Sequence, residues 1–212
     1  MKRFPVVACI AMLALSCDLW TRLDDDDDEG GGQSGFGRWT VKTGHDDDAG
    51  NVSTIAQSTT IAALRAMKPP SNLGGDTTRL TYAGSPETQT WRLTDVTLAG
   101  YKLESDGDYH LVLVDRAANS LIAEIVDPRR VAEGWKAQTT VARTAFDRHH
   151  LARSTFQTAG DTVTVTGVGF FDLLHGQIGV APNGIELHAV LGICFGADCS
   201  STEALTPAVA PP

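Results

Sequence analysis

The stretch YHLVLVDRAANSLIAEIVD, residues 109–127, decides the predicted fold because two apolar runs flank a short polar turn. Residues 109–115 and 121–126 each have the length and the content of aliphatic residues that are typical of one strand. Upstream, residues 89–103 alternate threonine with apolar residues, which indicates either one strand bent near Gly100 or two strands broken there. Together these segments predict three consecutive strands joined by short turns.

The segments on either side extend this pattern. After Pro128, residues 131–153 carry spaced apolar residues that predict a helix, and residues 162–171 and 185–195 read as two further strands. Residues 59–67 predict a short helix that begins at a threonine cap. Three strands, a helix and two strands are the order of an OB-fold, in which the helix lies between strands three and four. We therefore expect a mainly β protein with an OB-like five-stranded barrel and a short N-terminal helix; an open sandwich is the alternative.

Length and charge narrow the function classes. The chain has 212 residues, which suits one compact domain, and 26 Asp and Glu outnumber 17 Lys and Arg for a formal charge of −9. A protein this acidic repels the phosphates of DNA and RNA, so a nucleic-acid partner is not expected.

The N-terminus predicts export. Two basic residues precede a short apolar run, and residues 1–16 read as a signal peptide. The run ends in LALSC, which resembles the bacterial lipobox and implies lipidation of Cys17; an ordinary secretory signal cut nearby is the alternative. We predict a membrane-anchored lipoprotein that faces the periplasm or the cell exterior. Residues 17–37, with their aspartate and glycine runs, form a disordered tether to a single domain at 38–196, and residues 197–212 form a disordered tail.

The remaining cysteines also fit export. Four residues, Gly196 among them, separate Cys194 from Cys199, and an oxidising compartment favours a disulfide between the two cysteines.

Polar and titratable residues gather in the last part of the domain. Glu186 and His188 are two apart on a predicted strand and therefore share one face. Histidine and glutamate can shuttle protons or ligate a metal. The alternative interpretation is structural: the polar side chains of this region only hydrogen-bond backbone groups of a long turn. The candidate ligand-binding set is His110, His175, Gln177, Asn183, Glu186 and His188. Its ligand is an unidentified envelope molecule or protein, and no cofactor is expected in this interpretation.

The motifs YKLESDGDYHLVLVD, SLIAEI and VTGVGFFDLLHGQIGVAPNGIELHAVL resemble a widespread family of exported bacterial proteins without an established activity. The resemblance covers about residues 38–193, and it departs at Ala189, where a proline is more usual. It supports the domain boundaries and leaves the function open.

A second resemblance gives the enzymatic alternative. The DGD turn at 106–108 and Asp127 at the end of the next strand are similar to the staphylococcal-nuclease branch of OB-folds. This resemblance implies a calcium-dependent phosphodiesterase with Asp108 and Asp127 as metal ligands, Asp106 in support and Glu124 nearby. The family's glutamate and arginine fall here on Arg130 and Ile122, so its base and its phosphate clamp are missing.

Overall fold

The computed structural model describes residues 37–196 and Cys199. The predicted signal peptide, Cys17, the tether up to residue 36 and most of the tail lie outside the described residues. Within the described part of the chain, no helix is both long enough and apolar enough to cross a membrane.

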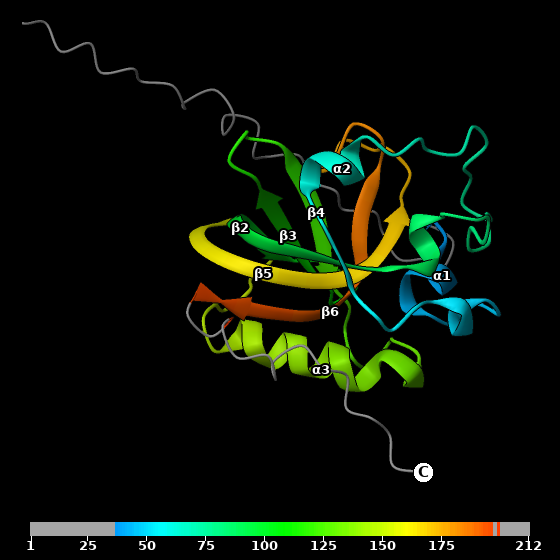
Figure 1. Ribbon diagram of the computed structural model, residues 1–212. Coiled ribbons are helices and arrows are strands. Elements are labelled where there is room, and N and C mark those ends of the chain that lie inside the picture. Colours follow the sequence, from blue (N-terminus) through cyan, green and yellow to red (C-terminus); the bar gives the residue numbers. More distant parts are fainter. Residues whose placement is uncertain (1–36, 197–198, 200–212) are drawn as a thin grey trace, which may run out of the picture. The chain divides into compact units, whose positions relative to one another are not determined.

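The protein is mainly a six-stranded β-sheet, and its longest helix lies between the fourth and fifth strands in the sequence (Figure 1). The strands are β1 (Gln57–Thr59), β2 (Thr90–Leu103), β3 (Tyr109–Val114), β4 (Ser120–Ile125), β5 (Gln157–Phe171) and β6 (Ile185–Phe195). The helices are α1 (Trp39–Thr43), α2 (Ile61–Arg65) and α3 (Glu133–Asp147), with 3₁₀ turns η1 (Ala49–Asn51) and η2 (Pro86–Thr88).

Five of the strands hydrogen-bond in a ring. The pairs β2–β3, β3–β4, β5–β6 and β2–β5 are antiparallel, whereas β4 and β6 are parallel. Strand β1 adds to β2 in parallel, outside this ring. The predicted order of three strands, a helix and two strands is confirmed, with α3 between β4 and β5.

Two boundaries differ from the sequence prediction. Helix α3 is shorter than the predicted 131–153. It begins after Ala132 and ends at Asp147. Strand β5 begins at Gln157 rather than at residue 162, because its first residues pair with β2, as in the register Gly100 to Thr158. Such long-range pairing leaves no local alternation in the sequence.

The short helix is predicted correctly. Helix α2 falls inside the expected segment, and its cap is Thr60, whose side chain accepts a hydrogen bond from the Ala63 amide. Helix α1 and strand β1 were not predicted, since each is too short to show a period.

The core lies on one face of the strands. Leu111, Leu113, Leu121, Ala123 and Leu187 are completely buried there, together with Phe146 of α3. Because side chains alternate along a strand, the residues between these face the other way. This outer face of β3, β4 and β6 carries the polar residues described below.

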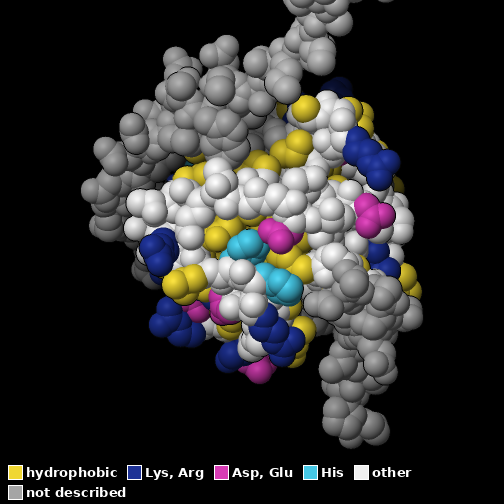
Figure 2. All heavy atoms as spheres, turned by 90° about the vertical axis from the view of Figure 1, so that its left-hand side faces the viewer, with side chains coloured by type: hydrophobic (Ala, Val, Ile, Leu, Met, Phe, Trp, Pro, Cys, Tyr) yellow, Lys and Arg dark blue, Asp and Glu magenta, His cyan; other side chains and the backbone are white. Residues whose placement is uncertain are grey.

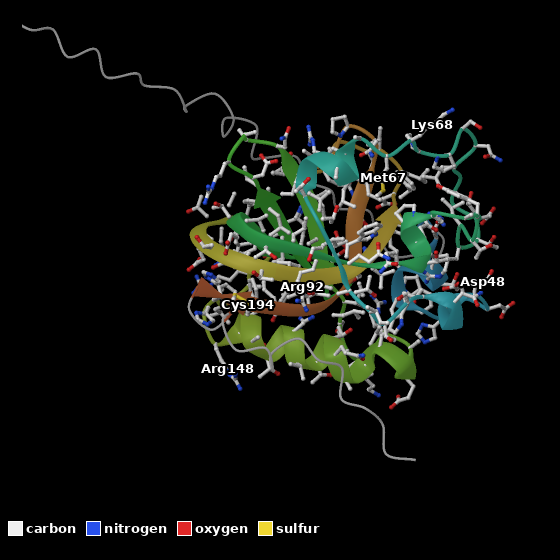
Figure 3. All side chains as sticks on the ribbon, in the orientation of Figure 1. Asp48, Met67, Lys68, Arg92, Arg148 and Cys194 are labelled. Carbon is white, nitrogen blue, oxygen red and sulfur yellow. A yellow bond between two sulfur atoms is a disulfide. The ribbon has the colours of Figure 1, made fainter. Side chains whose placement is uncertain are left out.

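The two C-terminal cysteines lie at disulfide distance, as expected, with 5.1 Å between their Cα atoms. Cys194 belongs to the end of β6, close to the end of α3 in Figure 3.

Candidate functional site

The site begins with the register of three neighbouring strands. His110 of β3 pairs with Glu124 of β4 across the antiparallel ladder, and Glu124 pairs with His188 of β6 across the parallel one. The three side chains therefore form one row on the outer face, with the carboxylate between the two imidazoles. All three are buried.

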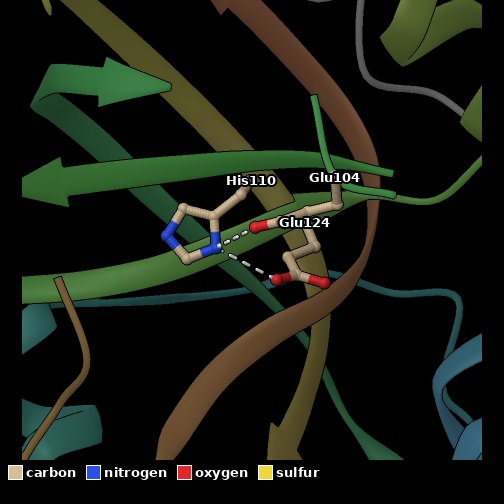
Figure 4. Close-up of side chains that lie close together, drawn as sticks. All are labelled: Glu104, His110 and Glu124. Carbon is tan, nitrogen blue, oxygen red and sulfur yellow. Dashed lines mark hydrogen bonds and ion pairs between the residues drawn. The ribbon is translucent and has the colours of Figure 1, made fainter. Parts of the chain in front are cut away.

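His110 faces two carboxylates with one ring nitrogen. Its Nδ1 lies 3.2 Å from Glu124 Oε1 and 3.5 Å from Glu104 Oε1 (Figure 4). Its other nitrogen, Nε2, lies 2.9 Å from the carbonyl oxygen of Ile178. A carbonyl can only accept, so Nε2 carries the hydrogen and Nδ1 is free to act as a ligand atom or to hold a second proton.

His188 is held in the same manner from the other side of Glu124. Its Nδ1 lies 3.0 Å from Glu186 Oε1 and 3.1 Å from Glu124 Oε2. Its Nε2 is buried and has no hydrogen-bond partner in the protein. The nearest carboxylate oxygen is Asp108 Oδ2 at 3.7 Å, which is too long for a hydrogen bond.

A lysine from the N-terminal segment lies beside this row and binds a neighbouring aspartate. Lys42 of α1 donates to Asp172 Oδ2 at 2.8 Å, and its ammonium lies over the Phe170 ring at 5.4 Å from the centroid. Burial alone would lower the pKa of Lys42, but Glu186 and Asp172 raise it, so the lysine stays charged. It supplies one positive charge beside several carboxylates.

The carboxylates perturb one another and the histidines. Burial raises the pKa of Glu186 to about 7, and the charge of Asp172 acts in the same direction. Burial alone would lower the pKa of His188, but Glu124 and the neighbouring carboxylates raise it to about 10. The pKa of Glu124 is well below its usual range, because the charge of His188 and the hydrogen bond from His110 outweigh its burial.

Two sets of three side chains are close enough to hold one ion each. One ligand atom from each of Asp108, Glu124 and His188 lies within 4.8 Å of the others, and the same is true of Glu104, His110 and Glu124. These are the sets of this kind within residues 37–196 and Cys199. Glu124 belongs to both.

The six residues of the predicted ligand-binding strip do not form a single site. His110 and His188 lie in the buried row, and Glu186 contacts His188 beside it. The side chain of His175 is 54% exposed and lies 4.0 Å from Asp172. Asn183 instead donates to the carbonyl oxygens of Leu64 and Met67, which ties the β5–β6 connection to α2.

Gln177 is a separate case within the strip. Its Oε1 is buried and has no hydrogen-bond partner in the protein. It precedes Ile178, whose carbonyl oxygen contacts His110.

The residues of the nuclease-like set are also divided. Asp108 Oδ1 accepts a hydrogen bond from the Asp127 amide at 2.8 Å, but the carboxylate of Asp127 is held by the Arg129 guanidinium. That pairing lowers the pKa of Asp127. Asp106 accepts from the Asp108 amide within its own turn. Glu124 is the member of this set that joins Asp108 at a common point.

Sequence reasoning missed two members of the site. Glu104 comes from a turn and Lys42 from a five-residue helix, and Lys42 lies far in the sequence from His110 and His188. The signal that could have found Glu104 is its position just ahead of the DGD turn, opposite the histidine of the next strand.

A second group of histidines reaches the surface elsewhere. Figure 2 shows histidine side chains beside an acidic one on the left-hand face of Figure 1, with lysine and arginine around them. After α3, His150 Nε2 lies 2.9 Å from Asp161 Oδ2, and His149 stacks on Phe195 with 4.1 Å between ring centroids. Neither histidine belongs to a described set of three ligand-type side chains.

Comparison of the chain with protein families, with curated proteins and with solved structures finds no match. The candidate function therefore rests on the residues and their geometry.

Proposed function

We propose that this chain is an exported, lipid-anchored envelope protein whose OB-like barrel domain binds a divalent transition-metal ion between Asp108, Glu124 and His188. The unidentified ligand that the sequence predicts is then a cation. The site retains His110, Glu186 and His188 from the predicted strip.

The connections of the ring support the OB-like assignment. The ring strands β2 to β6 correspond to strands one to five of an OB-fold. Three antiparallel strands, β2 to β4, lead to α3, β4 runs parallel to β6, and β5 pairs with β2. OB-folds bind their ligands on the face of strands two and three and on the loops after strands one and four. Here those elements are β3, β4, the turn that contains Asp108 and the β5–β6 connection, and the buried row lies among them.

One observation carries the metal assignment: the buried His188 Nε2 without a hydrogen-bond partner. Nδ1 of the same ring lies against the Glu186 and Glu124 carboxylates, which orients the ring and leaves Nε2 as the ligand atom. A metal ion about 2.1 Å from both atoms would bridge Nε2 and Asp108 Oδ2, whose 3.7 Å separation is too long for a hydrogen bond. Without an ion, the protonated ring would bury an N–H donor that has no acceptor.

The chemistry of the ligand atoms selects the class of ion. Calcium prefers oxygen ligands alone, whereas imidazole together with carboxylate suits zinc, manganese, iron, cobalt and nickel. The metal proposed here therefore differs from the calcium that the nuclease resemblance implies.

The phosphodiesterase alternative remains a prediction. It needs Asp127 as a ligand, and the pairing of Asp127 with Arg129 favours the binding function over it. The lipid anchor, the export signal and the absence of a nucleic-acid partner are proposals that rest on the sequence of residues 1–17 and on the charge of −9.

Metal analysis tests the proposal. The purified chain is dialysed against micromolar Zn²⁺, Mn²⁺ or Ca²⁺, and the bound metal is measured by mass spectrometry. We expect bound Zn²⁺ or Mn²⁺ in the wild type, and a loss of affinity of at least about tenfold in Asp108→Asn, which removes one ligand charge. His175→Gln changes an exposed histidine and is the matched control, expected to bind as the wild type does.

Three results would contradict the proposal. They are no bound ion at these concentrations, equal affinity in Asp108→Asn and the wild type, or selective binding of Ca²⁺. Hydrolysis of a phosphodiester that stops in chelator and returns with metal would instead support the alternative.

A further inference from the structure

Glu124 belongs to two sets of ligand-type side chains, and this shared membership points to a second ion. We infer that the site is binuclear, with Glu124 as the carboxylate bridge, one ion at Asp108 and His188, and another at Glu104 and His110. This inference rests on the proposed metal-binding function and deepens it.

The two oxygens of Glu124 serve different histidines. Oε1 lies 3.2 Å from His110 Nδ1, and Oε2 lies 3.1 Å from His188 Nδ1. The Oε2 contact is a hydrogen bond from Nδ1, since His188 would bind the first ion through Nε2. Glu124 is the candidate bridge because it belongs to both sets of ligand-type side chains, whose ligand atoms lie within 4.8 Å of one another. The strand register fixes this central position, because Glu124 pairs with His110 on one side and with His188 on the other.

The atoms around the second position have the spacing of ligands on one ion. Atoms bound tetrahedrally at about 2.05 Å lie about 3.3 Å apart. His110 Nδ1 lies 3.2 Å from Glu124 Oε1 and 3.5 Å from Glu104 Oε1. The three residues come from β3, β4 and the turn between β2 and β3, so the strand ladder fixes two of the three ligands (Figure 4).

The second histidine is also oriented for ligation. The hydrogen bond from His110 Nε2 to the Ile178 carbonyl commits that nitrogen as a donor. Backbone carbonyl partners of this kind fix the tautomer of metal-ligating histidines. The lone pair of a neutral ring then points from Nδ1 toward the two carboxylates, and this arrangement is repulsive unless a proton or a metal ion lies between them.

Carboxylates outnumber lysines around the two histidines, and bound cations would replace the protons that these histidines otherwise share with the carboxylates. Glu104, Asp108 and Glu124 bring three carboxylates, and Lys102 Nζ, 3.3 Å from Glu104 Oε1, is the lysine in contact with this group. Lys42 is engaged with Asp172. The side chain of Glu104 is 28% exposed, which gives the second position contact with solvent, whereas that of Asp108 is 7% exposed. We therefore expect the second ion to exchange faster than the first.

Titration of the metal-free full chain with Co²⁺ tests the inference. Bound cobalt is counted by metal analysis, and electron paramagnetic resonance (EPR) is recorded after each addition. We expect two Co²⁺ ions per chain, and the EPR intensity per ion should fall with the second equivalent because ions that share a carboxylate couple magnetically. Glu104→Gln should bind one ion with an uncoupled signal, whereas Glu133→Gln, at an exposed position on α3, should bind two.

The outcomes distinguish a failure of the metal-binding function from a failure of the binuclear centre. No bound Co²⁺ overturns both the metal-binding function and the binuclear centre. One ion in the wild type, or two ions without coupling, overturns the bridged centre and leaves the mononuclear site standing. Two coupled ions in Glu104→Gln would also overturn the assignment of the second position.

Discussion

At the scale of single residues, the fold depends on one buried ion pair that lies apart from the candidate site. The Arg38 guanidinium binds the Glu87 carboxylate through two hydrogen bonds of 2.6 Å, and both side chains have no exposed surface. Arg38 also donates to the carbonyl oxygens of Thr77, Thr78 and Phe171. The pair thereby ties the N-terminal segment to the end of β5.

Glu87→Gln removes the charge partner of Arg38 while conserving shape. Because a buried guanidinium is then left without a counter-charge, we expect the free energy of unfolding to fall by about 3–5 kcal/mol. Urea denaturation measures it. Glu133→Gln, at the exposed start of α3, should change stability by less than about 0.5 kcal/mol, and a Glu87→Gln variant as stable as this control would contradict the assignment.

At the scale of elements, the curvature of β2 decides which strands meet. The register between β2 and β3, and between β2 and β5, shifts at Leu98/Gly100, so β2 pairs with both strands along its length. Glycine is required at position 100 by close packing. A Cβ there would lie against the Phe156 ring and 2.9 Å from the Gln157 carbonyl oxygen.

Gly100→Ala should therefore destabilise the protein by about 1–3 kcal/mol, because the added methyl group forces β2 and β5 apart. The matched control is Gly134→Ala in α3, where a Cβ meets nothing within 4 Å and better helix propensity should stabilise by up to about 1 kcal/mol. Equilibrium unfolding followed by circular dichroism compares the two. Equal stability in both variants would refute the packing argument.

At the scale of the whole molecule, the candidate site joins parts of the chain that are far apart in sequence. Its ligand atoms come from the turn after β2 and from β3, β4 and β6, while α1 and the β5–β6 connection cover it. An ion bound at this point would therefore hold the turn after β2 and strands β3, β4 and β6 together. Ligands that bind only the native state stabilise it, by about 2.7 kcal/mol at a hundredfold excess over Kd.

We consequently expect EDTA to lower the Tm of metal-loaded protein by about 5–10 °C, since 1 kcal/mol corresponds to about 2–4 °C for a chain of this size. Excess Zn²⁺ should restore the original value. Differential scanning calorimetry makes the comparison, with Asp108→Asn as the reference, whose Tm should fall by at most about half as much in chelator because it binds the ion at least about tenfold more weakly. An equal response in that variant would place the stabilising ion elsewhere.

Local patterns in the sequence predict the order of the elements and part of the site. The aliphatic runs at residues 109–115 and 121–126 and the threonine cap of α2 are local signals, so the strands, the short helix and the facing of Glu186 and His188 were predictable. The register between strands was not, because a ladder depends on contacts between segments far apart in the chain.

Tertiary structure alone decided which polar residues meet. It placed Glu124 between two histidines, added Glu104 and Lys42, and left His175 exposed and Asn183 bound to the α2 carbonyls. Spacing in the sequence sets which face of a strand a side chain occupies. Burial and the pairing of neighbouring strands set the charges and ligand atoms around it, and these are properties of the folded chain.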